Sequence, residues 1–225
     1  MKNLKILFTS ALIMIAAFAA NAQDIDEFQE EDLLPETPAA KFGVSPFASY
    51  DYQFRYNTAD EVNSSFMGVT AGAQAYMDFS KIFTLKAGLA YKCSFSGSTV
   101  AYYNLQKGDA SIVEHSLELP ITFGVKFPVG SHTMHIDIGP TGTFGMASTM
   151  TAKNNVLYYV DGTRYDMYDT GMAQRWNLYA SGNFGFEVSE KVVVSAGYRY
   201  GFFNAGNDDN TIAIHCINAM VVINL

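Results

Sequence analysis

Apolar and polar side chains alternate along the chain from residue 83 to residue 95. Apolar residues fill the odd positions, and polar or small residues fill most of the even ones (FTLKAGLAYKCSF). An α-helix would place Lys86 beside Leu89 and Ala90 on one face, whereas a β-strand points successive side chains to opposite faces. The pattern therefore predicts a β-strand with one apolar and one polar face.

Seven further segments repeat this alternation, and none carries a competing helical period. They are longer than the strands of soluble domains, which usually have about five or six residues. A tilted strand needs about nine to eleven residues to cross a membrane. The sequence therefore predicts an all-β fold, an eight-stranded antiparallel up-and-down transmembrane β-barrel over residues 42–225. The further segments are residues 42–56, 67–79, 117–127, 134–146, 176–188, 192–203 and 211–225.

The predicted connections between these strands alternate between short and long. Outer-membrane barrels have this asymmetry because their periplasmic turns are short and their surface loops are longer. A soluble β-sandwich has no reason to sort its connections in this way. The short turns lie near residues 80–81, 128–131 and 189–191, and the long loops are 57–64, 97–110, 149–173 and 205–210.

Charged side chains occur on the polar face of the predicted strands, with five basic and five acidic members. If the apolar face meets lipid, these charges line the lumen. Buried charges are costly unless they are paired, and a balanced set permits pairing. Side chains fill the interior of an eight-stranded barrel, so we expect a plugged, polar cylinder without an open pore. The predicted lumen charge network is Asp51, Arg55, Asp78, Lys86, Lys92, Glu118, Lys126, Asp137, Glu187 and Arg199.

A soluble barrel with an apolar, ligand-binding lumen is the alternative. It does not explain why outward positions are depleted in acidic residues, or why the connections are sorted by length. Aromatic residues near the strand ends also fit the interfacial girdles of membrane barrels, although aromatics are good strand formers in any setting. The girdle candidates are Tyr50, Tyr52, Phe54, Phe79, Phe83, Phe127, Trp176, Phe186, Tyr198 and Phe202.

The start of the chain has the features of a cleaved signal peptide, predicted over residues 1–22. Lys2 and Lys5 precede an apolar run over residues 6–20, which is short for a membrane-spanning helix. Residues 23–41 are acidic and contain two prolines, which predicts a flexible periplasmic lead-in. The expected location is the outer membrane after export.

Three stretches carry a family resemblance. Residues 116–127 (SLELPITFGVKF), 138–140 (IGP) and 185–201 (GFEVSEKVVVSAGYRYG) resemble the central strand, the strand after the central turn and the seventh-strand hairpin of one family. That family is the outer-membrane β-barrel domain family of gram-negative bacteria, often labelled "porin family". The resemblance covers residues 42–225 and implies the same fold and location. The label itself does not indicate conduction.

Catalysis by the histidines has little support in the sequence. Some small barrels modify lipid A with a Ser or His–acid constellation. His135 and Asp137 are two positions apart on the predicted inward face and could form an oriented pair, although we favour a histidine that is solvated or paired in the lumen. Ser116 or Ser131 would have to complete a triad, but no spacing supports one. We therefore expect no enzyme and keep a lipid-modifying enzyme as an alternative.

Metal and cofactor sites are not expected either. The histidines lack HxxxH spacing and the cysteines lack CxxC spacing. Cys93 and Cys216 point to opposite faces in the predicted register, so we expect no disulfide between them.

The long connection at 149–173 is the most suggestive candidate for ligand binding. Tyrosine and aspartate side by side can stack on sugars and bind hydroxyl groups. The alternative, which we favour, is that Asp161-Gly162 marks a hairpin whose tyrosines belong to strands continuing above the membrane. The candidate ligand-binding residues are Tyr158, Tyr159, Asp161, Arg164, Tyr165, Asp166, Tyr168 and Asp169.

The leading expectation is a structural or surface-interaction protein whose extracellular loops meet a partner. A narrow porin or transport protein is the alternative. Expected partners are membrane lipid, the barrel-assembly machinery during insertion and an unidentified surface ligand, with the barrel itself a monomer. Cleavage of the signal peptide would move the formal charge from −8 to −10, and this acidity argues against nucleic acid as a partner.

Overall fold

The computed structural model describes residues 40–57, 62–103, 106–130, 132–152, 162–169, 173–202 and 212–224. The chain divides into two units, Met1–Ala39 and Ala40–Leu225, and the described residues belong to the second. The predicted signal peptide lies outside them, as does all but the end of the predicted lead-in, so both stay predictions. Within the described part of the chain, no helix has the length and apolar character to cross a membrane.

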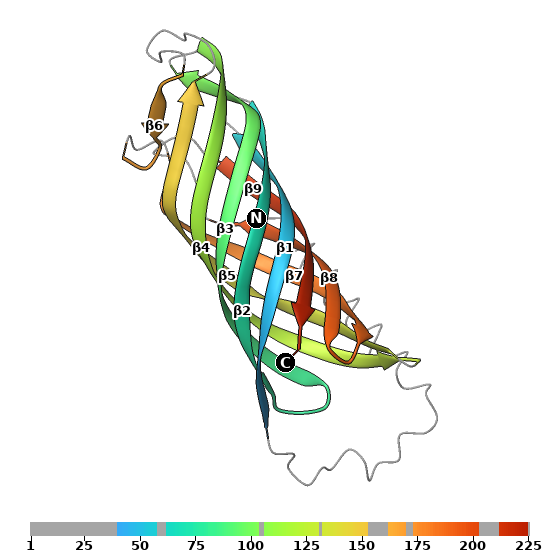
Figure 1. The fold of residues 1–225 in the computed structure, drawn as a ribbon. Coiled ribbons are helices and arrows are strands. Elements are labelled where there is room, and N and C mark those ends of the chain that lie inside the picture. Colours follow the sequence, from blue (N-terminus) through green and yellow to red (C-terminus); the bar gives the residue numbers. More distant parts are fainter. Residues whose placement is uncertain are drawn as a thin grey trace, which may run out of the picture. The chain divides into compact units, whose positions relative to one another are not determined.

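Eight long strands form one closed antiparallel sheet (Figure 1). The ring runs β4-β3-β2-β1-β9-β8-β7-β5, and pairing between β4 and β5 closes it. This confirms the predicted eight-stranded up-and-down barrel. A ninth strand of three residues, β6, pairs with the upper part of β5 outside the ring. The strands are β1 Lys41–Asn57, β2 Val62–Asp78, β3 Phe83–Tyr103, β4 Gln106–Val129, β5 His132–Ala152, β6 Arg164–Asp166, β7 Trp176–Ser189, β8 Val192–Gly201 and β9 Ile212–Ile223.

The apolar face of each strand points outward. Leu89, at the middle of the apolar row of β3, is 56% exposed, and Leu85, Phe123 and Ile223 are also exposed. Glu118, on the opposite face of β4, is only 2% exposed. The barrel therefore has an apolar exterior and a polar interior, and the alternative of an apolar ligand-binding lumen is wrong.

Aromatic side chains gather near the ends of the outer face. Phe79, Phe83 and Phe123 pack together close to the β2–β3 turn, with ring centroids 5.6–6.1 Å apart. Trp176 packs on Phe144 at 4.7 Å toward the opposite end of the barrel. Rings at both ends of the apolar exterior fit the two interfacial girdles of a membrane barrel.

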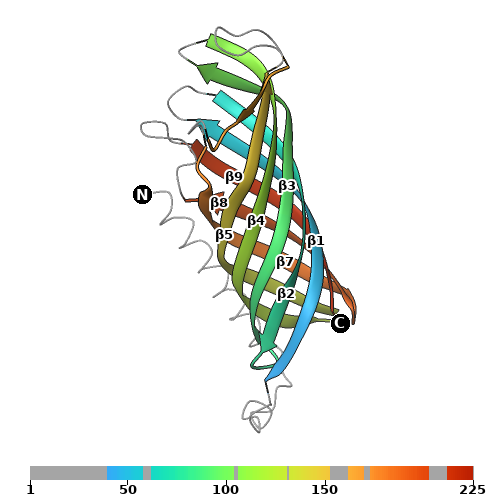
Figure 2. The ribbon, with the colours of Figure 1, turned by 60° about the vertical axis from the view of Figure 1, so that its left-hand side comes forward.

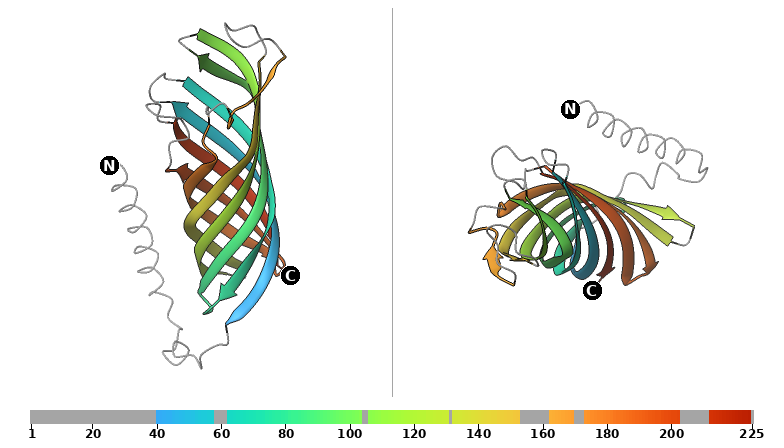
Figure 3. Two further views of the ribbon diagram at one scale, coloured as in Figure 1. Left: turned by 90° about the vertical axis from the view of Figure 1, so that its left-hand side faces the viewer. Right: turned by 90° about the horizontal axis from the view of Figure 1, so that it is seen from above.

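The connections differ from the predicted loops in two places. The predicted loop 97–110 is wrong, because β3 continues to Tyr103 and β4 starts at Gln106. Likewise, β5 extends to Ala152 inside the predicted loop 149–173. The polar residues that suggested loops belong to strands that extend beyond the membrane, where no lipid enforces an apolar outer face. Figures 2 and 3 show β3, β4 and β5 extending past their neighbours, and we call this extension the protrusion.

Candidate functional site

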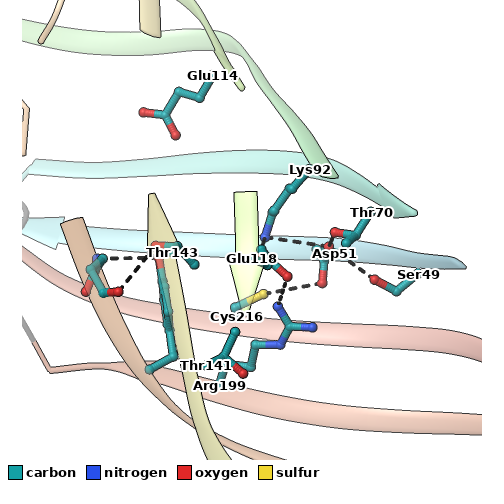
Figure 4. Close-up of polar contacts among 12 residues, drawn as sticks. Ser49, Asp51, Thr70, Lys92, Glu114, Glu118, Thr141, Thr143, Arg199 and Cys216 are labelled. Atoms are coloured by element: carbon teal, nitrogen blue, oxygen red, sulfur yellow. Dashed lines mark hydrogen bonds and ion pairs between the residues drawn. The ribbon is translucent and has the colours of Figure 1, made fainter. Parts of the chain in front are cut away.

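Four charged side chains meet at the centre of the lumen (Figure 4). Glu118 on β4 accepts a hydrogen bond from Arg199 on β8 at 2.8 Å and lies 3.5 Å from the Lys92 ammonium. Lys92 also lies 3.5 Å from Asp51, which accepts a hydrogen bond from Thr70 at 2.7 Å. All four charged groups are buried. Two acids and two bases thus neutralise one another in the middle of the barrel, and we call them the central cluster.

The other predicted lumen charges also lie in ion pairs. Arg55 pairs with Glu114 toward the protrusion. Near the short turns, Lys86 pairs with Asp137 at 2.8 Å, Lys126 with Asp78 at 2.7 Å and His135 with Glu187 at 2.8 Å. Nine of the ten predicted residues thus lie in ion pairs, and the tenth, Glu187, shares a hydrogen bond with His135 that becomes an ion pair when the imidazole is protonated.

Two members of these pairs escaped the sequence prediction. Glu114 faces inward on β4, but the predicted strand began only at residue 117, so its alternation was not counted. His135 could have paired with Asp137 on the same face, but its hydrogen bond goes to Glu187 on the neighbouring strand β7. Side chains two residues apart on one strand are farther apart than those on neighbouring strands. The residue directly opposite His135 is Gly185, and its missing side chain leaves room for Glu187.

Two apolar clusters interrupt the polar lumen. Phe47, Ala90, Val193 and Val222 pack together between the central cluster and the short-turn end. At the base of the protrusion, a second cluster consists of Phe66, Ala110, Ile112 and Met150, with Tyr165 and Met167 packed against it. The sequence prediction of a uniformly polar lumen missed both. The available signal was an occasional large apolar residue, such as Phe47, at an otherwise polar inward position.

The segment after β6 folds back over the mouth of the barrel. Met167 donates its backbone N–H to the Ser148 carbonyl at 2.8 Å, and Gly145 donates to the Arg175 carbonyl at 2.6 Å. The Tyr168 ring lies against Gly145, where any side chain would collide with its hydroxyl. The Arg175 guanidinium lies over the face of that ring, 4.7 Å from its centroid. Burial, reinforced by the charge of Glu114, raises the pKa of Tyr168 to about 12, so the phenol stays neutral at physiological pH.

The predicted ligand-binding residues divide into four groups. Tyr158, Tyr159 and Asp161 lie outside the described residues. Asp166 and Tyr168 serve the loop itself, since the Asp166 carboxylate accepts the backbone N–H groups of residues 168 and 169. Tyr165 packs toward the apolar cluster of the protrusion. Arg164 and Asp169 are the two that stay exposed to solvent.

The remaining chemical candidates are dispersed. Cys93 faces outward on β3, whereas the Cys216 thiol is buried 3.8 Å from Asp51, and both are free. On the outer face, His115 hydrogen bonds to Tyr91 and His215 to Tyr198. Among the described residues, no three His, Cys, Asp or Glu side chains are grouped to hold a metal ion.

Known proteins resemble this chain at two levels. The sequence profile described as "Outer membrane protein beta-barrel domain" matches residues 10–224. No curated protein sequence matches the chain significantly. Similar solved structures include Neisserial surface protein A, with 12% identity, a TM-score of 0.46, and coverage of 83% of this chain and 99% of that chain. Ail of Yersinia pestis has 9% identity and a TM-score of 0.40 over 81% and 99%. OprG from Pseudomonas aeruginosa has 10% and 0.38 over 81% and 93%.

Proposed function

The chain belongs to the family of outer membrane protein β-barrel domains, and from this membership we propose that it is a surface-interaction protein whose filled barrel anchors an extracellular binding edge. The filled lumen supports an anchoring role. The central cluster occupies the middle of the barrel, and an apolar cluster flanks it on each side. Tyr168 and Arg175 cover the mouth near the protrusion. Among the described residues, these layers occupy successive levels of the lumen, which supports a barrel closed to hydrated solutes.

The absence of conduction is the first expected result. Planar-bilayer recordings of the purified protein should show no steady channels, because the charges of the central cluster hold one another in the lumen. An empty bilayer is the baseline, and a known porin reconstituted in the same lipid is the positive control. Steady conductance in the nanosiemens range, proportional to the amount of protein added, would contradict the filled-barrel proposal and favour the porin alternative.

The proposal rests on a stretch at the end of β3, one side of which would be the binding edge. Pairing between β2 and β3 ends at Met67 and Phe95, but β3 continues to Tyr103. A register shift between Ser96 and Thr99 marks an irregularity of the β3–β4 pairing where the two strands leave the β2 seam. Among the described residues, no strand pairs with the β2-facing side of residues 97–103, and we call this segment the free edge.

The composition of the free edge favours strand addition. Natural proteins protect exposed edges with proline, lysine or other charged residues, because unpaired N–H and C=O groups attract another strand. The free edge (GSTVAYY) has none of these residues and contains good strand formers. The proposed occupant is therefore an extended segment of a partner protein, bound by main-chain hydrogen bonds.

Peptide selection on the intact protein tests this edge. A displayed peptide library would be selected on the protein in lipid nanodiscs, and bound peptides are expected to slow amide exchange at residues 97–103. The double substitution Thr99→Lys with Ala101→Lys should lower the affinity for these peptides at least about tenfold. The matched control is Thr149→Lys with Thr151→Lys, on the part of β5 already paired with β6. Peptides that bind both variants equally well, or that protect another region, would contradict the proposal.

A further inference from the structure

A recess opens at the short-turn end of the barrel, which faces the periplasm in outer-membrane barrels. Its volume is about 470 Å³, within the range of about 300–1,000 Å³ typical of small-molecule sites. Lumen-facing residues of the ring strands line it, and the cluster around Phe47 separates it from the central cluster. We call this recess the periplasmic cavity.

One wall of the periplasmic cavity is polar. The Lys86–Asp137, Lys126–Asp78 and His135–Glu187 pairs lie along it. An ammonium group has three protons to donate, and a carboxylate can accept several hydrogen bonds. The second oxygens of Asp78 and Asp137 are buried and have no hydrogen-bond partner among the described residues. The wall therefore retains both donor and acceptor capacity after its ion pairs have formed.

An apolar patch adjoins these polar groups. Val193 on β8 and Met220 and Val222 on β9 line the cavity, and they belong to or pack on the cluster around Phe47. Val193 is the direct cross-strand partner of Glu187, so polar and apolar groups lie next to one another. A site of this mixed character suits a ligand that has both polar groups and apolar surface.

We propose that the periplasmic cavity binds a small uncharged polyol, a mono- or disaccharide, from the periplasmic side. The lining contains four lysines and four carboxylates, so it offers no net charge to attract an ion. A sugar hydroxyl both donates and accepts hydrogen bonds, and so it can serve the lysines and the carboxylates together. The C–H groups of the sugar ring would meet Val193, Met220 and Val222. This site is independent of the free edge and its partner.

Methyl NMR of the intact protein tests the proposal directly. The barrel would be placed in phosphatidylcholine nanodiscs, which avoid sugar detergents, with labelled Val and Met methyl groups. Glucose and maltose added to about 100 mM, a range that covers millimolar dissociation constants, should shift the Val193, Met220 and Val222 methyls saturably. The Met150 methyl lies in the other apolar cluster and should not move.

Two variants make the site assignment specific. Asp78→Asn should weaken sugar binding about tenfold, because it replaces an unpartnered carboxylate oxygen. Asp169→Asn is the matched control at the opposite end, where Asp169 also forms a single ion pair, and it should bind as the wild type does. Val193→Trp should fill the cavity and abolish the shifts. The absence of saturable shifts in the wild type would overturn the proposal. Equal binding by Asp78→Asn, or shifts with alanine or putrescine but not with sugars, would overturn it as well.

Discussion

Replacing Glu118 with glutamine is expected to lower the free energy of unfolding by about 3–5 kcal/mol, the usual cost of removing one partner from a buried ion pair. Glu118 is the shared acceptor of Arg199 and Lys92. Without its charge, two buried cations would depend on Asp51, which lies 3.5 Å from Lys92. Glutamine keeps the size of the side chain, so the loss would report charge and not packing.

Urea unfolding in phosphatidylcholine vesicles measures this change. Asp169→Asn removes an exposed ion pair, since the Asp169 side chain is 75% exposed, and should cost less than about 1 kcal/mol. Combining Glu118→Gln with Arg199→Gln should cost less than the sum of the single changes, because the double variant removes the stranded cation. Equal stability of Glu118→Gln and Asp169→Asn would show that the central cluster contributes no more than a surface pair.

The direction of each lumen charge was predictable because alternation is a local property. Each of the ten charges occupies an inward position of a strand that the sequence reveals by itself. Their partners were not predictable, because pairing depends on which residues of different strands come level with one another. Arg55 and Glu114 lie 59 positions apart in the chain, and their pairing depends on the register of several strands between them.

The protrusion escaped prediction for a related reason. In the membrane, lipid enforces an apolar outer face and makes alternation easy to see. Above the membrane no lipid enforces an apolar outer face, so the upper parts of β3 and β4 continue as strands without that signal. The register shift opposite His115/Ser116 also moves the inward side chains of β5 from odd positions, such as Thr143, to even ones, such as Ser148. Sequence reasoning therefore defined the membrane-spanning barrel better than the part we propose to bind a partner.

Arginine in place of Leu89 should lower the free energy of unfolding by about 2–4 kcal/mol, the cost of an arginine near the middle of a barrel's lipid face. Leu89 is the central residue of the outward row of β3 and is exposed on the outer face. Tyr56→Arg, on the outward face near the far end of β1, should cost less than about 1 kcal/mol, because the penalty falls toward the interface. Urea titration in the same vesicles would compare the two.

Lys86 and Lys92 serve as internal controls for the Leu89→Arg substitution. They lie three positions before and after it on β3, but they face the lumen, where Asp137 and the acids of the central cluster accept their charge. The strand itself thus tolerates long cationic side chains, and a penalty at residue 89 alone would measure the contact with lipid. A Leu89→Arg barrel as stable as the Tyr56→Arg barrel would mean that the outer face of β3 does not meet hydrocarbon, and the membrane-spanning orientation would fail with it.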